Sequence, residues 1–251
     1  MEPIIVAKNL TKIYKTGTSR INALNNVDVA VMPGEFVAIV GTSGSGKSTL
    51  LSLLAGLETP TAGKIMVMGH PIHRMNERQL VDFRLKHIGF IFQAYNLMPT
   101  LTALENAAFP LSCQGVKRSV RNKKAAELLT AMGLKEHLQH KPMELSGGQQ
   151  QRVSTARAII AAPRIVFADE PTGNLDSRTS GEIMDILRTV VRYNRTTLLL
   201  VTHDMEKAKY ADRIIQIMDG RISNTASAIV ADTPDGRTNT SLSGGNTCTG
   251  L

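Results

Sequence analysis

The spacing of apolar residues predicts that the chain begins with β-structure. Val27, Val29 and Val31 recur at every second position and end at the turn-forming pair Pro33-Gly34. A period of two is typical of a strand with one buried face. Short apolar runs at Ile4–Val6 and Lys64–Met68 fit further strands. The pattern therefore predicts an N-terminal antiparallel β-subdomain.

A different pattern interrupts this subdomain. Phe36–Val40 is a continuous apolar run, a glycine-rich loop follows, and Lys47–Leu57 is rich in helix-forming residues. A run of this kind is typical of a fully buried strand. We therefore expect the order strand, loop, helix at this point of the chain.

The middle of the chain has a helical pattern. Ile88–Phe92 is a last short β-rich run, and the helix-like stretches Leu101–Ala108, Ala125–Met132 and Gln149–Ile160 follow. Within the last stretch, Val153, Ala156, Arg157 and Ile160 recur at intervals of three and four, as in an amphipathic helix. We expect a helical subdomain over about residues 94–160, inserted into the core.

Buried strands return in the last third. Arg164–Ala168 and Thr197–Thr202 are apolar runs separated by a predicted helix at Ser177–Val191. Strands alternating with helices predict a mainly parallel sheet in an α/β fold. Residues 224–251 are rich in Ser, Thr, Asn and Gly and have almost no large apolar side chains, so we expect a folded unit over 1–223 and a disordered tail over 224–251.

Composition excludes several classes of protein. The 251 residues are 42% apolar and 20% charged, as in an ordinary globular protein. The longest apolar runs, such as Leu53–Leu57, fall far short of the roughly 20 residues of a membrane span. No basic region followed by an apolar stretch marks a secretory signal. Cys113 and Cys248 are the only cysteines, which excludes a disulfide scaffold and a zinc cluster. We expect a cytoplasmic protein.

The net charge of +8 has two interpretations, a nucleic-acid or membrane partner and a scattered, solvated surface. The one dense basic patch lies between Lys117 and Lys124, where a solvated helix start accounts for it. Aromatic residues make up only 4% of the chain and include no Trp, which supplies few platforms for stacking bases. No nucleic acid is expected as a partner.

The loop after the buried strand Phe36–Val40 carries the first chemical motif. Its residues fit the phosphate-binding pattern G-x-x-x-x-G-K-[ST] at every fixed position; they are Gly41, Thr42, Ser43, Gly44, Ser45, Gly46, Lys47 and Ser48. The backbone N–H groups can surround a phosphate, and the next helix offers its positive end. Lys47 supplies a cation for the outer phosphates, and Ser48 supplies a hydroxyl ligand for Mg²⁺. We also count Thr49, the next residue, among the expected nucleotide-binding residues. These residues predict a P-loop NTPase core that binds ATP with Mg²⁺.

Two carboxylates end the strand Arg164–Ala168. Asp169 and Glu170 follow directly, and acids at the end of a buried strand are costly unless a cation or water accepts them. We expect Asp169 to hold Mg²⁺ through its hydration shell and Glu170 to polarise the attacking water. The alternative is a pair of acids that only caps the next helix.

A third motif identifies the type of ATPase. Leu145-Ser146-Gly147-Gly148-Gln149 places a hydroxyl and two glycine amides at the start of a second helix, which makes a second anion site. One nucleotide needs only one such cradle. The motif resembles the signature of ATP-binding cassette (ABC) proteins, in which Ser146, Gly147, Gly148 and Gln149 would contact the nucleotide held by a partner subunit.

This resemblance implies further site residues. Tyr14 resembles the aromatic residue that stacks on adenine, and Gln93 resembles the glutamine that contacts Mg²⁺ and water. Gly173-Asn174-Leu175-Asp176 resembles the loop that crosses the dimer, and His203 resembles the histidine that contacts the γ-phosphate. Glu170, His203 and Gln93 are therefore the expected catalytic residues, and Ser48, Gln93 and Asp169 the expected metal site.

The resemblance also implies a function. It predicts a homodimer or pseudo-dimer that closes around two ATP molecules and drives separate transmembrane permease subunits, so that the protein lies on the inner face of the cell membrane. The sequences of residues 146–153 and 168–176 are similar to those of one branch of the family, which holds macrolide-efflux, lipoprotein-release and antimicrobial-peptide-resistance ATPases. Amino-acid and metal importers remain the main alternative. Soluble members that act on DNA or ribosomes fit less well, because no heptad run or second phosphate loop is present.

Overall fold

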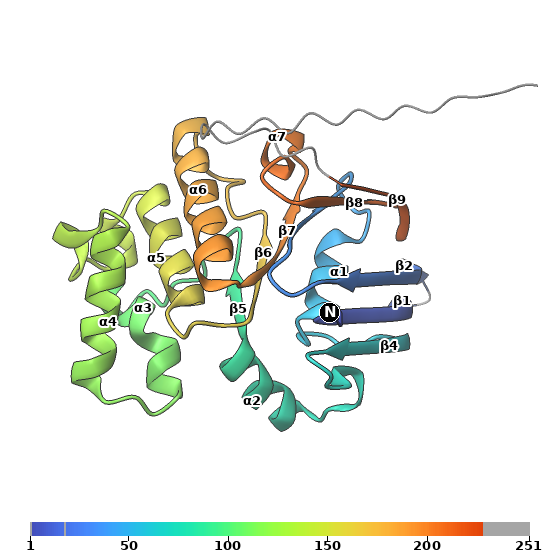
Figure 1. Ribbon diagram of the computed structural model, residues 1–251, viewed down its shortest axis with the longest axis horizontal. Helices are drawn as coiled ribbons and strands as arrows, with labels where there is room; N and C mark the ends of the chain where they lie inside the picture. The colour runs from blue at the N-terminus through green and yellow to red at the C-terminus, as the bar shows by residue number, and fades with distance from the viewer. Residues whose placement is uncertain (1, 18, 228–251) are drawn as a thin grey trace, which may run out of the picture.

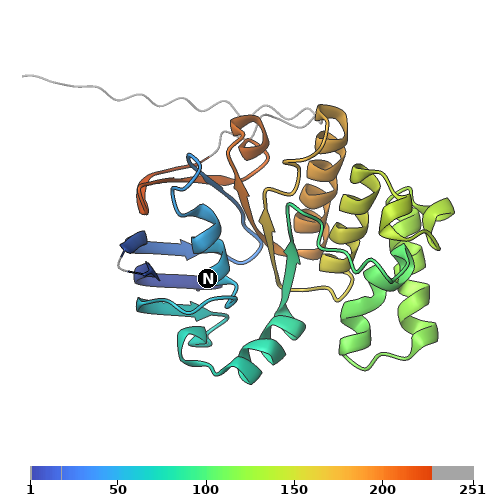
Figure 2. The same ribbon diagram turned by 180° about the vertical axis from the view of Figure 1, so that it is seen from behind.

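The computed structural model describes residues 2–17 and 19–227, which form two sheets and a set of helices (Figures 1 and 2). The strands are β1 (Ile5–Thr16), β2 (Ser19–Val31), β3 (Phe36–Val40), β4 (Ala62–Val67), β5 (Ile88–Ile91), β6 (Ile165–Asp169), β7 (Thr197–Thr202), β8 (Arg213–Met218) and β9 (Arg221–Ser227). The α-helices are α1 (Lys47–Leu54), α2 (Glu77–His87), α3 (Ala103–Cys113), α4 (Arg118–Ala131), α5 (Gly147–Ile159), α6 (Ser177–Asn194) and α7 (Met205–Ala208). Short 3₁₀ turns cover Ile72–Arg74, Lys135–His137 and Pro142–Glu144.

The sheet topology confirms the predicted α/β class. One antiparallel sheet has the order β2-β1-β4, and the second has the order β5-β6-β7-β3-β8-β9. In the second sheet β5, β6, β7, β3 and β8 pair in parallel, and only β9 is antiparallel to its neighbour. All residues of β3 and β7 are buried, which explains their unbroken apolar sequences.

Two hydrophobic clusters cover the two faces of the parallel sheet. Helix α1 packs Leu50, Leu51, Leu53 and Leu54 between this sheet and the antiparallel β-subdomain. The opposite face packs against α5, α6 and the small residues of α3. Figures 1 and 2 show the β-subdomain on one side of the molecule and α3, α4 and α5 on the other. Among the described residues, no helix is long and apolar enough to cross a membrane.

The structure differs from the predicted elements at a few points. Helix α2 was not predicted, since only Leu80 and Phe83 of its residues are buried and its pattern is mostly polar. Helix α3 begins two residues later than expected, because the Thr102 side chain caps it by accepting a hydrogen bond from Glu105 N. Helix α4 begins at Arg118, inside the basic patch.

The end of the folded unit also differs. Residues 224–227, which the composition assigned to a disordered tail, belong to β9 and pair with β8. Antiparallel pairing uses backbone groups and does not require large apolar side chains, so the composition did not reveal it. The remaining predicted tail, residues 228–251, lies outside the described residues.

Candidate active site

The phosphate loop lies between β3 and α1, as the sequence predicted. Residues 41–46 form the loop and Lys47, Ser48 and Thr49 open α1. Gly46 is the N-cap of α1 with φ +102°, and a Cβ atom there would collide with the Ala23 carbonyl oxygen. No side chain caps α1, and no acid stands in its first turn. The N–H groups at this helix end are therefore available to an anion.

Lys47 and Ser48 connect the loop to the end of β6. The Lys47 side chain is buried, and its Nζ donates a hydrogen bond to Thr42 O at 2.7 Å within the loop. Ser48 Oγ donates to Asp169 Oδ1 at 3.0 Å. Burial raises the pKa of Asp169, and the charge of Glu170 raises it further, whereas the Ser48 hydrogen bond and the Lys47 charge lower it. A hydroxyl and a carboxylate side by side are the hard oxygen ligands that fit Mg²⁺.

The three expected catalytic residues meet beside this pair. His203 Nδ1 lies 3.1 Å from Glu170 Oε1, within ion-pair distance. A Cβ atom added at Gly173 would lie 2.9 Å from Gln93 Nε2 and 3.4 Å from Glu170 Oε2, so both side chains border the same glycine. Glu170 has φ +44°, a left-handed conformation that is strained for a residue with a side chain. The chain thus holds Glu170 out of ordinary strand geometry, directly after β6.

Tyr14 lies near the phosphate loop but is already engaged. Its hydroxyl donates to Glu58 Oε2 at 2.8 Å, and Lys12 Nζ lies 4.9 Å from the centre of its ring. Burial raises the pKa of Tyr14, Thr49 lowers it through a hydrogen bond, and Glu58 raises it. The contact with Thr49 places the ring beside the start of α1, which is compatible with the predicted contact with the base.

The signature residues lie apart from the phosphate loop. Ser146 Oγ accepts from Gln149 N at 3.3 Å, Ser146 N donates to Gln149 Oε1 at 2.9 Å, and Gln149 Nε2 lies 3.0 Å from His137 Nε2. Across residues 2–17 and 19–227, no hydrogen bond joins Ser146, Gly147, Gly148 or Gln149 to the phosphate loop. In Figures 1 and 2, the helices that begin with the two motifs, α1 and α5, lie in different parts of the molecule, with strands of the parallel sheet between them. The two predicted anion sites are therefore separate in this chain.

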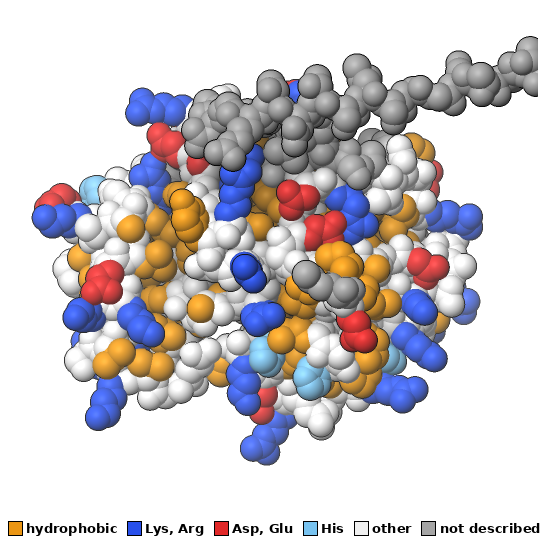
Figure 3. All heavy atoms as spheres, in the orientation of Figure 1, with side chains coloured by type: hydrophobic (Ala, Val, Ile, Leu, Met, Phe, Trp, Pro, Cys, Tyr) orange, Lys and Arg blue, Asp and Glu red, His pale blue; other side chains and the backbone are white. Residues whose placement is uncertain are grey.

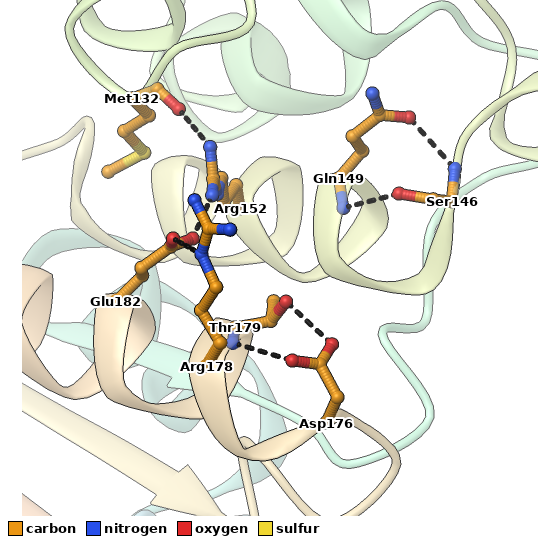
Figure 4. Close-up of polar contacts among 8 residues, drawn as sticks. All are labelled: Met132, Ser146, Gln149, Arg152, Asp176, Arg178, Thr179 and Glu182. Atoms are coloured by element: carbon orange, nitrogen blue, oxygen red, sulfur yellow. Dashed lines mark hydrogen bonds and ion pairs between the residues drawn. The ribbon is translucent and has the colours of Figure 1, made fainter.

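The start of helix α6 packs against the signature, since a Cβ atom added at Gly148 would lie 2.6 Å from Thr179 Cγ2. Asp176 caps α6 by accepting hydrogen bonds from Thr179 N at 3.0 Å and Thr179 Oγ1 at 2.7 Å, and the backbone bond from Thr179 is the main reason why its pKa is lowered. Figure 4 shows this cap and the Ser146 cap on the same side of the helix pair. Arg152 of α5 and Arg178 of α6 both pair with Glu182, which ties the two helices together.

Arg157, to which the sequence analysis assigned no role in the site, binds the segment that follows Gln93. Arg157 of α5 donates from Nη1 to Asn96 O at 2.6 Å and from Nη2 to Tyr95 O at 2.8 Å. Tyr95 and Asn96 follow Gln93 closely and both have positive φ. An available signal was the place of Arg157 within the apolar stripe of its helix, where a charged residue needs a structural reason.

Comparisons with known proteins agree with this geometry. The family model described as ABC transporter matches residues 24–173. The chain is 45% identical over 222 residues to the lipoprotein-releasing system ATP-binding protein LolD of Geobacter metallireducens, covering 88% of this chain and 99% of that protein. It is 46% identical over 222 residues to an uncharacterized ABC transporter ATP-binding protein of Thermotoga maritima, covering 88% and 94%.

Solved structures give the same result. Two dimeric ATP-binding cassettes match with a TM-score of 0.85 each, at 40% and 41% identity, and each match covers 91% of this chain and 100% of the solved chain. One of them is a post-hydrolysis state bound to ADP and Pi. The chain belongs to the ABC transporter ATPase family, whose members hydrolyse ATP.

Proposed function

We propose that this chain is the ATP-hydrolysing subunit of an ABC transporter and pairs around two ATP molecules to drive a separate permease. The observation that carries the proposal is the separation of the signature residues, at the start of α5, from the chain's own phosphate loop, at the start of α1 (Figure 1). A second chain, placed head to tail, would bring its signature to the first chain's nucleotide. The dimeric arrangement of the two similar solved cassettes supports this pairing.

The residues at the end of β6 suit hydrolysis by water. Glu170 would polarise the water, and His203, which lies 3.1 Å from Glu170 Oε1, would contact the γ-phosphate. Gln93, which borders Gly173 together with Glu170, would contact Mg²⁺ and the water. Lys47 and the open N-terminus of α1 bind the outer phosphates. Mg²⁺ held by Ser48 and Asp169 would neutralise charge on the phosphates. Positioning and charge stabilisation then supply most of the rate enhancement.

An apolar groove is suited to a cytoplasmic segment of the permease. It has a volume of about 310 Å³ and is formed by α2, β5, α3 and α5. Val81 and Phe109 on its walls are 46% and 40% exposed. Arg157 also lines the groove, and it binds the segment that follows Gln93. We propose that residues 94–111 and this groove face the permease at the inner face of the cell membrane.

The similarity to LolD favours one branch of the family. That relative is described as part of a lipoprotein-releasing system, and the shared length is nearly the whole of it. We propose export, lipoprotein release or antimicrobial-peptide resistance as the transport process, with the permease selecting the substrate.

Glu170→Gln tests the shared nucleotide sites. The amide keeps the size of the carboxylate but cannot act as a base, which typically costs about 10²–10⁴-fold in rate. The variant should bind ATP and elute as a dimer from a sizing column with ATP but not with ADP. Adding Ser146→Arg should return it to a monomer, because the long side chain fills the place of the partner's phosphate. If the Glu170→Gln cassettes did not pair at saturating ATP even when the permease was present, the proposal that two chains share the nucleotide sites would be wrong.

Crosslinking tests the permease surface. Cys113 is exposed on the groove wall, so the Cys248→Ser protein carries one natural reporter there. In an assembled transporter, Cys113 of this protein should crosslink to the permease. Single cysteines introduced at Leu97, Met98 and Leu101, in a background that also carries Cys113→Ser, should crosslink to it as well. Tyr193→Cys, at a position 84% exposed on α6, serves as the control. If all positions including Tyr193→Cys crosslinked equally, or if no position at the groove crosslinked, the proposal that this surface contacts the permease would be wrong.

A further inference from the structure

A cavity at the far end of α6 collects four arginines. It has a volume of about 790 Å³, within the range of small-molecule sites. Arg164, Arg188, Arg192 and Arg195 line it together with Tyr210 and Asp212. In Figure 3, blue Lys and Arg side chains lie near the middle of this face, over the region where α6 and β7 join in Figure 1.

The charges of this cavity are not balanced. Asp212 is the only acid among the lining residues, and its Oδ2 already accepts a hydrogen bond from Phe36 N at 2.8 Å. In the part of the chain that the structure describes, none of the four arginines has a carboxylate within ion-pair distance. At the other end of the same helix, Arg178 pairs with Glu182 (Figure 4). Within residues 2–17 and 19–227, the cavity therefore concentrates positive charge on guanidinium groups that form no ion pair.

The backbone at Arg195 is left-handed, which fixes where this side chain leaves the end of α6. Arg195 is the C-cap of α6 and has φ +52°. The left-handed region is unfavourable for a residue with a Cβ atom, and helix ends of this kind usually carry Gly or Asn. The helix dipole does not explain this choice, because Arg192 already supplies a cation to the last turn. The chain accepts strain at a position whose side chain lines the cavity.

The cavity is distinct from the nucleotide site. Phe36, Arg164 and Arg195 stand at or just before the amino ends of β3, β6 and β7. The phosphate loop, Asp169 and His203 stand at the carboxyl ends of these strands, which are about 16–20 Å long. Helix α6 spans about 27 Å, from the Asp176 cap near the signature to the cavity. A ligand at Arg188 and Arg195 would therefore act at one end of a helix whose other end supports the signature.

We propose that this cavity binds a small molecule with several phosphoryl groups, separately from the transported substrate and the hydrolysed ATP. Arginine forks match phosphate oxygens in pairs, and several guanidinium groups together favour a ligand with more than one such group. The half-buried Tyr210 ring adds an aromatic surface to the lining for the organic part of the ligand.

Tripolyphosphate is the probe for this site. In a Lys47→Ala background, which weakens the nucleotide site, calorimetry should show one tripolyphosphate bound per chain. Arg188→Gln with Arg195→Gly should weaken that binding at least tenfold. Arg78→Gln, which removes a charge from exposed α2, is the control and should change the dissociation constant less than twofold. No binding, or equal weakening by the control, would overturn the proposal.

Arg195→Gly separates ligand binding from stability. Without a ligand, the variant should melt about 2–4 °C higher, because glycine relieves the left-handed strain. The rise in melting temperature that tripolyphosphate gives the Lys47→Ala protein should shrink in the same variant. Vesicles of phosphatidylglycerol provide the other arm of the test. If the arginine changes released the protein from vesicles and left tripolyphosphate binding intact, the cavity would serve a lipid headgroup and the proposal would be wrong.

Discussion

Arg157 donates a hydrogen bond to the carbonyl oxygen of Tyr95 at 2.8 Å, across 62 positions of the chain. The same guanidinium binds Asn96 O, and burial lowers its pKa. Tyr95 in turn reaches the signature, since a Cβ atom added at Gly147 would lie 2.9 Å from its hydroxyl oxygen. One arginine thus fixes the segment after Gln93 against the helix that carries the signature.

Arg157→Met should lower kcat at least about tenfold and leave the dissociation constant for ATP nearly unchanged. Hydrogen bonds to a charged group contribute about 1.5–3 kcal/mol each, and without them Tyr95 and Asn96 are free to leave their left-handed conformations. Arg157→Lys keeps the charge and one bond and should recover part of the rate. Steady-state ATPase kinetics and ATP titration distinguish the two effects, with Arg78→Met as control. An equal loss of ATP affinity would show general unfolding instead of mispositioning.

Gly148→Ala should destabilise the protein by about 1–3 kcal/mol, the usual cost of overpacking. A Cβ atom there would lie 2.6 Å from Thr179 Cγ2 of α6. Thr179→Ser removes that methyl group and keeps the hydroxyl that donates to Asp176. The double variant should therefore unfold in urea close to the wild-type midpoint. Gly181→Ala, whose Cβ meets nothing within 4 Å, should stabilise by about 0.5–1 kcal/mol. If Thr179→Ser did not restore the stability of the Gly148→Ala variant, the destabilisation would not come from the contact with the Thr179 methyl group.

Lys47→Ala should abolish tight binding of ATP and leave the fold intact. The buried ammonium is the cation of the phosphate loop, and its one hydrogen bond within the loop goes to Thr42 O. Calorimetry should detect the loss of ATP binding, while the far-ultraviolet circular dichroism spectrum should match that of the wild type. Unchanged ATP affinity would remove Lys47 from the nucleotide site.

Local sequence was enough to predict the parts of this molecule in which neighbours along the chain act together. The phosphate loop, the acids at and after the end of β6 and the capped signature helix each lie within one short segment, and the structure has the predicted strand, loop and helix around them. The roles of their side chains stay predictions. The parallel sheet followed from buried strands such as β3 and β7, whose apolar runs have no polar face.

Features that join distant segments were not predictable in the same way. The place of Arg157 in the apolar stripe of its helix indicated that its charge needs a partner, but its acceptors are backbone carbonyls, which any sequence provides and no motif marks. Helix α2 begins with the Asn76–Gln79 capping box and buries only Leu80 and Phe83 of its described residues, which is too few apolar positions for a periodic signal. The arginine cavity needs the fold to bring Arg164 and Tyr210 to the end of α6.

Asp169→Asn should raise the melting temperature of the nucleotide-free protein at about pH 7. Burial is the largest cause that raises the Asp169 pKa in the folded state. The folded protein therefore holds this proton more tightly than the unfolded chain, whose aspartate has a pKa of about 3.9. The resulting stability is present below that value and is lost as the pH rises through the raised pKa. Asparagine cannot ionise and avoids the loss.

The difference between the two proteins should shrink as the pH falls from about 7 toward the ordinary aspartate pKa of about 3.9. With MgATP bound, the wild-type protein should have the higher melting temperature, because a bound divalent cation favours the carboxylate that the Asp169→Asn variant lacks. Melting curves with and without MgATP across this range provide the measurement, and Asp82→Asn, at an exposed position of α2, is the control. A lower melting temperature for the ligand-free variant at about pH 7 would contradict this account. It would mean that the contacts with Ser48 and Lys47 outweigh the cost of burying the charge.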